Sequence, residues 1–206
     1  MKVSHVLYKV YNLHEAVINF EKLGFKVEYG SKHNPHNALI YFSEGPYIEL
    51  LSQAPVPSYV HFLLNILGKR PVARRFQRWK NTPEGFFGLC LENYEKDFTK
   101  EEEILSFYKQ KYFITKSTRT DPSNRNLKWK LLFPYNLQLP FLMTYFNIDP
   151  KPKDFVHPNG VKEISSISFG TDASLIPIIN ELCDDDVLEL HVGDGVKSLT
   201  YGEHSH

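Results

Sequence analysis

Residues 3–51 read VSHVLYKVYN LHEAVINFEK LGFKVEYGSK HNPHNALIYF SEGPYIELL, and the spacing of apolar side chains in this stretch decides the fold. Residues 3–10 alternate between two faces, which is the period of a strand. Asn12 then precedes apolar side chains at helical spacing and Gly24 ends that pattern, so we predict a capped helix. Further strands are predicted at 25–29, 38–42 and 47–51. This stretch is therefore predicted to form a βαβββ unit.

The same order of elements returns in the middle of the chain. Residues 86–91 have an apolar strand pattern, and Thr99 with Glu102 gives a capping box ahead of a second helix. Strand patterns follow at 112–118, 127–133 and 139–146. A repeated βαβββ order indicates internal duplication. We therefore predict two like units whose sheets pair with each other.

A shorter copy follows a linker rich in Pro, Lys and Asp at 149–154. A strand pattern, a helix that begins after Asp172 and two more strand patterns make a βαββ unit, with the strands at 164–169, 187–192 and 196–201. About 45 residues bury too small a core to fold alone without disulfides or a metal. We expect this unit to dock on another unit, either in the same chain or in a second copy, which would make a homodimer.

These patterns divide the chain into four parts: the first unit at 1–53, a helical basic connector at 54–83, the second unit at 84–148, and the linker with the partial unit at 149–206. Two short helices are predicted in the connector, at 58–67 and 72–79. Six cations crowd around the second helix: Lys69, Arg70, Arg74, Arg75, Arg78 and Lys80. A charge run of this kind is most often a solvated face.

Composition excludes several classes of function. The chain has 24 Lys and Arg residues and 24 Asp and Glu residues, so its formal net charge is zero. This balance gives no general electrostatic attraction to nucleic acid or to an anionic membrane. No apolar run reaches the roughly 18 residues of a membrane span, and residues 1–5 enter a strand pattern without a signal peptide. A cytoplasmic protein is expected. Cys90 and Cys183 lie in apolar contexts without CxxC spacing and are predicted to be reduced core thiols.

Four segments carry a family resemblance: SHVLYKVYNL with His5, EGPYIELLS with Glu49, HNALIYF at 36–42 and HPNGVKEI at 157–164. Together with the duplicated βαβββ order, they resemble the vicinal oxygen chelate superfamily, which has the fold of glyoxalases and extradiol dioxygenases. More narrowly, they are similar to its glyoxalase-like bacterial families. The resemblance implies an α+β fold in which two units curve into a mixed-sheet half-barrel, a cup, with the partial βαββ unit added at the C-terminus.

The resemblance also implies a divalent metal in the cup, held by side chains from the first and fourth strands of each unit. His5 and Glu49 match these positions in the first unit, and an imidazole with a carboxylate suits Fe, Mn, Ni or Zn. In the second unit, counting back from Asn93 as from Asn12 places Phe86 at the position of His5, and an alignment of FLMTYF with YIELLS is taken to place Thr144 opposite Glu49. Neither side chain is a good ligand. The candidates for a third ligand are His36, taken first, and His33, Glu189 and His191.

The same residues also have plain structural interpretations. His5 would be a half-buried strand histidine bonded to a neighbour, and His33 and His36 two solvated histidines of a turn. A carboxylate within the apolar run around Glu49 costs free energy to bury unless it is paired. Glu49 therefore indicates a polar, concave site.

Two functions follow from the resemblance. One is an enzyme, a metal-dependent lyase, isomerase or dioxygenase, in which the metal polarises vicinal oxygens of a small-molecule substrate and Glu49 is general base or charge stabiliser. The other is a metal-free module that keeps the cup as a small-molecule pocket, as drug-sequestering members do, and the poor second-unit ligands favour it. The basic helix is a candidate lid, so we expect Arg74, Arg78 and Trp79 to bind an anionic substrate.

Overall fold

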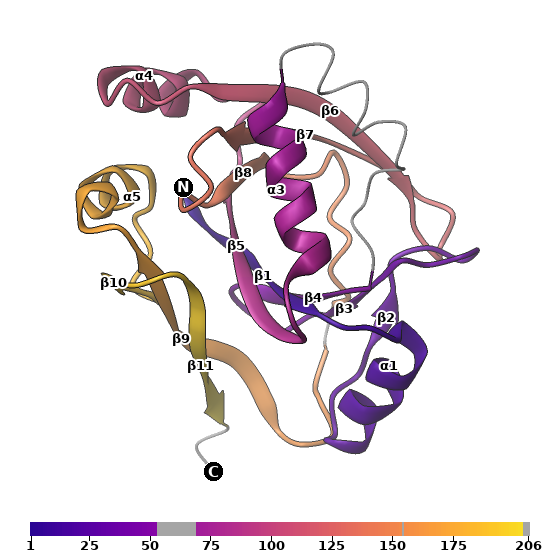
Figure 1. Cartoon of the computed structure of the whole chain (residues 1–206). Helices are drawn as coiled ribbons and strands as arrows, with labels where there is room; N and C mark the ends of the chain where they lie inside the picture. Colours follow the sequence, from indigo (N-terminus) through magenta and orange to yellow (C-terminus); the bar gives the residue numbers. More distant parts are fainter. Residues whose placement is uncertain (53–68, 154, 204–206) are drawn as a thin grey trace.

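The computed structural model describes residues 1–52, 69–153 and 155–203, and within these ranges the duplicated order of elements is confirmed (Figure 1). The first unit consists of β1 (Lys2–Lys9), α1 (Leu13–Lys22), β2 (Glu28–Tyr29), β3 (Asn37–Ile40) and β4 (Tyr47–Leu51). The second consists of β5 (Gly85–Asn93), α4 (Thr99–Phe107), β6 (Tyr112–Thr120), β7 (Asn126–Pro134) and β8 (Phe141–Thr144). Helix α3 (Arg70–Asn81) lies between them, and the helix predicted at 58–67 falls outside the described residues.

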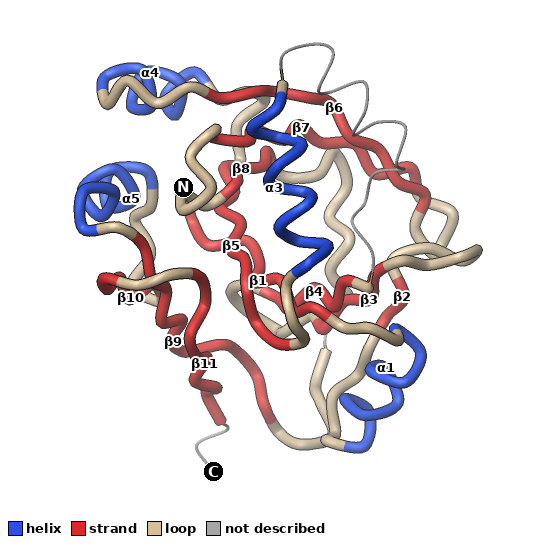
Figure 2. The backbone as a smooth tube through the Cα atoms, viewed as in Figure 1, coloured by secondary structure: helices blue, strands red, loops and turns tan. Residues whose placement is uncertain are grey.

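The two units join into one eight-stranded sheet with the strand order β2-β3-β4-β1-β5-β8-β7-β6. At its centre β1 pairs antiparallel with β5, and each of these strands pairs parallel with the last strand of its own unit, β4 or β8. Counted outward from the centre, each unit therefore contributes its first, fourth, third and second strands in the same order, as expected for a duplication. The sheet curls into a half-barrel around α3 (Figure 2), so the predicted α+β half-barrel is confirmed.

Alternation along the strands distributes apolar side chains between two cores. Val6 and Leu91 lie on the convex face, in a large cluster that also contains side chains of α1 and of the C-terminal unit. Leu7 lies on the concave face, where Phe76 and Trp79 of α3 belong to the same cluster. Burial of each such side chain stabilises the fold by about 1.5–3 kcal/mol. Helix α3 is therefore a packed part of the cup and not an appended surface helix.

The C-terminal unit contains β9 (Val161–Thr171), a 3-10 turn (Ala173–Leu175), α5 (Ile176–Leu182), β10 (Leu188–Val192) and β11 (Gly195–Glu203). Its separate three-stranded sheet has the order β10-β9-β11. Ile167 and Phe169 of β9 join the large cluster of the convex face. The backbone N–H of Val3 donates a hydrogen bond of 2.8 Å to Asp185 Oδ2. The unit thus docks on its own chain, and the homodimer stays a prediction.

Two helix starts test the predicted caps. Asn12 Oδ1 accepts a hydrogen bond of 3.2 Å from the backbone N–H of Glu15, as expected for the first helix. The cap predicted at Thr99 is wrong, because Thr99 is already the first residue of α4. Asp97 Oδ1 instead accepts from the Thr99 backbone N–H at 3.2 Å. Aspartate is a strong N-terminal capping residue, and here it lies two residues before the helix.

Two further predictions concern the whole chain. Among the helices of the described ranges, none combines the length and apolar character that a membrane crossing needs. Cys90 is buried and Cys183 half-buried, and both are free thiols, as predicted.

Candidate functional site

A cavity of about 490 Å³ opens on the concave face of the sheet. Most of its wall is apolar, and its lining residues include Leu7, Leu51, Phe76, Trp79, Trp129 and Phe133. Pockets for small molecules have volumes of roughly 300–1,000 Å³. The cup is therefore large enough for a small-molecule ligand.

Two strands of the first unit place His5 and Glu49 in this cavity. Strands β1 and β4 run parallel with His5 opposite Tyr47, and Glu49 lies two residues beyond Tyr47 on the same face. His5 Nε2 lies 3.3 Å from Glu49 Oε2. Asn37 donates a hydrogen bond of 2.7 Å from Nδ2 to Glu49 Oε1. The two residues that carry the family resemblance therefore meet in the cup.

His5 is almost completely buried, with 4% of its surface exposed. Its ring stacks on Tyr47 with a centroid distance of 4.7 Å, and the Phe141 ring meets it edge-on at 5.6 Å. Desolvation lowers the pKa of His5 to about 4, although the charge of Glu49 acts in the opposite direction. At neutral pH the imidazole is therefore uncharged, with one N–H to donate and one lone pair to accept.

Arg119, on β6, also lines the cup and was missed by the sequence analysis. None of the ion pairs between described residues involves Arg119, and its Nε is buried without a hydrogen-bond partner. The predicted strand ended at residue 118, two residues before the end of β6 at Thr120. Residues 113, 115, 117 and 119 alternate along β6, so a longer strand would have placed Arg119 on the cavity face.

Gly30 leaves the room that Asn37 needs beside Glu49. A Cβ atom at residue 30 would clash with Asn37 Oδ1 and lie 3.0 Å from Arg119 Nη1. Any larger residue would push the Asn37 amide from its place. Gly30 therefore shapes the polar part of the cup.

The second unit presents different side chains at the matching positions. Cys90 pairs with the first residue of β8, just as His5 pairs with the first residue of β4. Met143 and Glu49 are the third residues of these two strands. Cys90 and Met143 therefore occupy the positions that His5 and Glu49 occupy in the first unit.

This register corrects the placement of Phe86 and Thr144 at those positions. Asn93 served as the counterpart of Asn12 in the placement of Phe86, but Asn93 is the last residue of β5, whereas Asn12 lies three residues beyond the end of β1. In the alignment of FLMTYF with YIELLS, Met143 and not Thr144 stands opposite Glu49. The pairing between strands, and not the spacing along the chain, therefore fixes the matching positions.

Comparison with known families agrees with this geometry. A family model described as a glyoxalase-like domain matches residues 3–175. The chain belongs to the glyoxalase-like domain family. No curated protein has a sequence that matches the chain.

Several solved structures are similar to this chain. A hypothetical protein from Staphylococcus aureus superposes with a TM-score of 0.64 and 17% identity, over 95% of this chain and 88% of that one. Methylmalonyl-CoA epimerase from Streptomyces coelicolor, bound to 2-nitronate-propionyl-CoA, gives a TM-score of 0.43 and 14% identity over 70% and 96% of the chains. A glyoxalase I mutant from Zea mays gives 0.41 and 12% over 88% and 54%. The first of these structures has the same overall fold as this chain.

The donor atoms at the four matching positions do not fit the divalent metal centre implied by the family resemblance. Burial raises the pKa of the Cys90 thiol well above its ordinary value, so the thiol stays protonated, whereas the thiolate is the ligand form. Met143 offers a thioether, a soft donor poorly suited to Fe, Mn, Ni or Zn. In the described parts of the chain, no three His, Cys, Asp or Glu side chains gather into a group that could hold a metal.

The candidates for a third ligand lie in different places. His36 is exposed and lines the cup, whereas His33 lies in an exposed turn. Glu189 and His191 each contact a serine of β9, in the C-terminal sheet, and do not line the cup. The structure therefore brings only His36 into the same cavity as His5 and Glu49.

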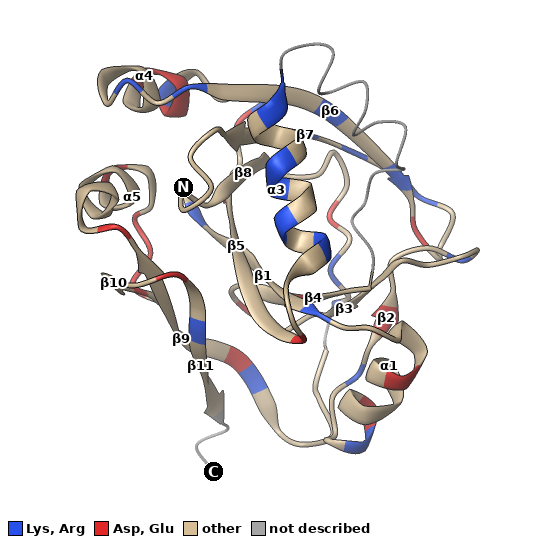
Figure 3. Cartoon of the chain, viewed as in Figure 1, with Lys and Arg blue, Asp and Glu red and all other residues tan. Residues whose placement is uncertain are grey.

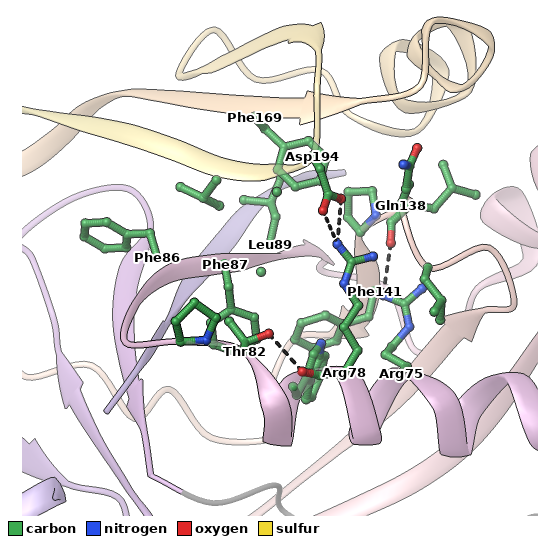
Figure 4. Close-up of a pocket in the computed structure, with 18 residues that line it drawn as sticks. Arg75, Arg78, Thr82, Phe86, Phe87, Leu89, Gln138, Phe141, Phe169 and Asp194 are labelled. Atoms are coloured by element: carbon green, nitrogen blue, oxygen red, sulfur yellow. Dashed lines mark hydrogen bonds and ion pairs between the residues drawn. The ribbon is translucent and has the colours of Figure 1, made fainter. Parts of the chain in front are cut away.

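Of the three connector residues predicted to bind substrate, only Trp79 lines the cup. Arg74 is exposed and lines neither the cup nor a second cavity of about 240 Å³ between α3 and the C-terminal unit. Arg78 lies in that second cavity, where its Nη2 donates to Asp194 Oδ1 at 2.6 Å (Figure 4). Figure 3 marks the basic residues along α3, while its buried apolar side chains Val72, Phe76 and Trp79 form part of the wall of the cup.

One cation of the basic run, Arg75, has a structural role. Its guanidinium is buried and donates to three backbone carbonyls of the connection before β8: Pro134 at 2.9 Å, Asn136 at 2.7 Å and Leu139 at 3.1 Å. These bonds hold the connection against α3. The residue therefore fixes the cup wall and does not face the ligand cavity.

Proposed function

We propose that this glyoxalase-like chain binds, without a metal ion, a small aromatic or apolar molecule that carries an anionic oxygen. The observation that carries the proposal is the makeup of the cup: an apolar cavity of about 490 Å³ into which His5, Glu49 and Arg119 all project. Pockets of this type use an apolar wall for affinity and a few polar groups for orientation. Arg119, which lacks an ion pair among described residues, supplies the positive charge that recognises an anionic oxygen.

Glu49 favours a second candidate function in the same cavity, the transfer of a proton from a carbon acid. Its carboxylate is held by Asn37 on one oxygen and faces the neutral His5 ring with the other. A carboxylate fixed in this way is placed to accept a proton from a bound ligand. Arg119 would then stabilise the negative charge that forms on the neighbouring oxygen of the ligand. Epimerisation, isomerisation and lyase reactions all begin with such a step.

Intrinsic fluorescence tests the binding proposal directly, because both tryptophans of the chain, Trp79 and Trp129, line the cup. We expect phenylacetate to change the fluorescence and raise the melting temperature. Phenylacetamide has the same ring without the charge and should bind at least about tenfold more weakly, since an ion pair with Arg119 is lost. Binding should survive dialysis against a chelator.

Two variants distinguish recognition by Arg119 in the cup from a general effect of removing one positive charge. Arg119→Gln should remove the preference for phenylacetate over phenylacetamide, whereas Arg74→Gln should preserve it, because Arg74 is exposed outside the cup. If a panel of aromatic carboxylates leaves both fluorescence and melting temperature unchanged, the proposed ligand class is wrong. Loss of binding after chelation would instead restore the metal-dependent interpretation.

A further inference from the structure

The second cavity, of about 240 Å³, lies between α3 and the C-terminal unit (Figure 4). Residues of α3, of β5, of the connection before β8 and of the turn between β10 and β11 form its wall. Its apolar lining side chains include Trp79, Phe86, Phe87, Leu89, Phe141 and Phe169. Pockets for drug-sized ligands have volumes of roughly 300–1,000 Å³. This cavity is therefore suited to a smaller molecule with an apolar body.

The charged side chains that line this cavity do not balance. They are Arg75, Arg78 and Asp194. Asp194 forms an ion pair with Arg78, whereas none of the ion pairs between described residues includes Arg75. The Arg75 guanidinium is buried among neutral backbone carbonyls, and its Nε has no hydrogen-bond partner in the described part of the chain. A buried charge without a counter-charge is unfavourable. The lining therefore has one positive charge in excess.

Arg78 retains unused donors on the solvent side of this cavity. Its side chain is 39% exposed, so a ligand can reach it from solvent. Nη2 alone donates to both carboxylate oxygens of Asp194. Within the described ranges, no hydrogen bond uses Nε or Nη1 of Arg78. A guanidinium presents a planar fork of donors that matches the two oxygens of a carboxylate. Arg78 can therefore bind a second carboxylate next to Asp194.

We propose that the second cavity binds a small aliphatic carboxylate, with its carboxylate on Arg78 and its alkyl group against Trp79 and Phe141. One negative charge neutralises the excess positive charge of the lining, whereas a phosphate group, with a charge of about −1.5 to −2, would exceed it. The small volume favours a short branched chain such as that of isovalerate. Asp194 repels the incoming carboxylate and limits its affinity. The site has a wall and a cation of its own, so it does not depend on the function proposed for the cup.

Two aromatic residues belong to both this cavity and the cup. Trp79 and Phe141 line both, whereas Trp129 lines the cup and not the second cavity. The chain has two tryptophans, so each can be studied alone. Trp129→Phe retains a fluorescent reporter for both cavities, and Trp79→Phe retains one for the cup alone. Fluorescence can therefore show which cavity a ligand enters.

Titration with isovalerate, followed by intrinsic fluorescence, tests the site. Arg119→Gln is present in every protein, because it removes the cation proposed to recognise an anion in the cup. In this background, isovalerate should change the fluorescence of Trp129→Phe and leave that of Trp79→Phe unchanged. Isovaleramide lacks the charge and should bind at least about tenfold more weakly. A response of Trp79→Phe alone, no response in either protein, or equal binding of acid and amide would each overturn the proposal.

Two further variants distinguish binding from a purely structural role of the ion pair. Arg78→Gln should weaken isovalerate at least about tenfold, because the fork of donors is lost. Asp194→Asn should strengthen it by at least about threefold, because a like charge is removed. A contact that only holds α3 to the C-terminal unit would be broken by both substitutions alike. Changes of affinity in the same direction would therefore show that the proposed site is wrong.

Arg74→Gln is the matched control, because it removes a positive charge of α3 outside both cavities. This variant should bind isovalerate as tightly as its parent. A loss as large as that in Arg78→Gln would show that only the general charge of α3 attracts the anion, and would overturn the site. If Arg78→Gln or Asp194→Asn fails to fold, the comparison of isovalerate with isovaleramide in Trp129→Phe decides.

Discussion

The two halves of the cup have the same backbone register but different chemistry. The first unit presents His5 and Glu49 on its first and fourth strands, and the second presents Cys90 and Met143 at the same places. The first pair is polar, with His5 Nε2 3.3 Å from Glu49 Oε2, whereas the second pair packs among aromatic side chains in the concave cluster. Duplication thus preserved the sheet while the side chains diverged. The polar groups proposed to orient a ligand are His5 and Glu49 of the first half and Arg119 of the second, whereas Cys90 and Met143 belong to the apolar cluster of the concave face.

The largest expected effect concerns the apolar half. Phe133, on β7, is 3% exposed and contacts the rings of Phe76 at 5.4 Å and Phe141 at 5.8 Å. Phe133→Ala should lower the free energy of unfolding by about 3–5 kcal/mol, because a buried ring leaves a cavity. Urea denaturation measures this loss. Phe107→Ala, at a ring that is 78% exposed, is the control and should change stability by less than about 0.5 kcal/mol.

The next effect concerns the polar half and its dependence on pH. The pKa of His5 is lowered to about 4 in the folded protein from 6.5, so the unfolded chain binds a proton more readily between these values. The contribution of His5 to the free energy of unfolding should be fully present above pH 6.5. It should be lost as the pH drops toward 4, which lowers the free energy of unfolding by about 3 kcal/mol.

Denaturation curves at several pH values measure this slope for two variants. His5→Phe gives the first half an apolar ring and should flatten the slope, whereas His14→Gln, at an exposed residue, should keep it. An unchanged slope in His5→Phe would show that another group controls the acid response.

A third prediction converts the second half into a copy of the first. Cys90→His with Met143→Glu places two further metal ligands at the matching positions, and the double variant should gain stability from Mn, Ni or Zn. At a metal concentration of about one hundred times the dissociation constant, the gain is about 2.7 kcal/mol. The unaltered chain should gain little. Thermal melts with and without metal measure both, and an equally large gain in the unaltered chain would show that it already contains a metal site.

Sequence patterns predicted the fold further than they predicted the site. Strand alternation and helical spacing are local signals, so the two βαβββ units and the partial third unit could be derived from residues alone. The register between strands is not local, and spacing counted from Asn93, the last residue of β5, missed Cys90. The register shift that makes Ser4 an extra residue of β1 depends on the pairing of β1 with β5, some 85 residues away, and leaves no mark on the alternation. Chemistry that arises between distant strands was therefore invisible.

The hydrogen bonds at the start of β1 have a consequence for the order of folding. Strand β1 lies at the centre of the large sheet, yet the backbone N–H of Asp184 donates to the carbonyl of Met1 at 3.0 Å, and Asp185 accepts from Val3. Loops of this size close late, because non-local contacts must overcome the entropy of the intervening chain. Strand β1 therefore acquires the partners of its first residues only after residues 184 and 185 have been synthesised. Its pairing with β4 and β5 involves nearer segments of the chain, so we expect the C-terminal unit to dock last, on a sheet centre that is already paired.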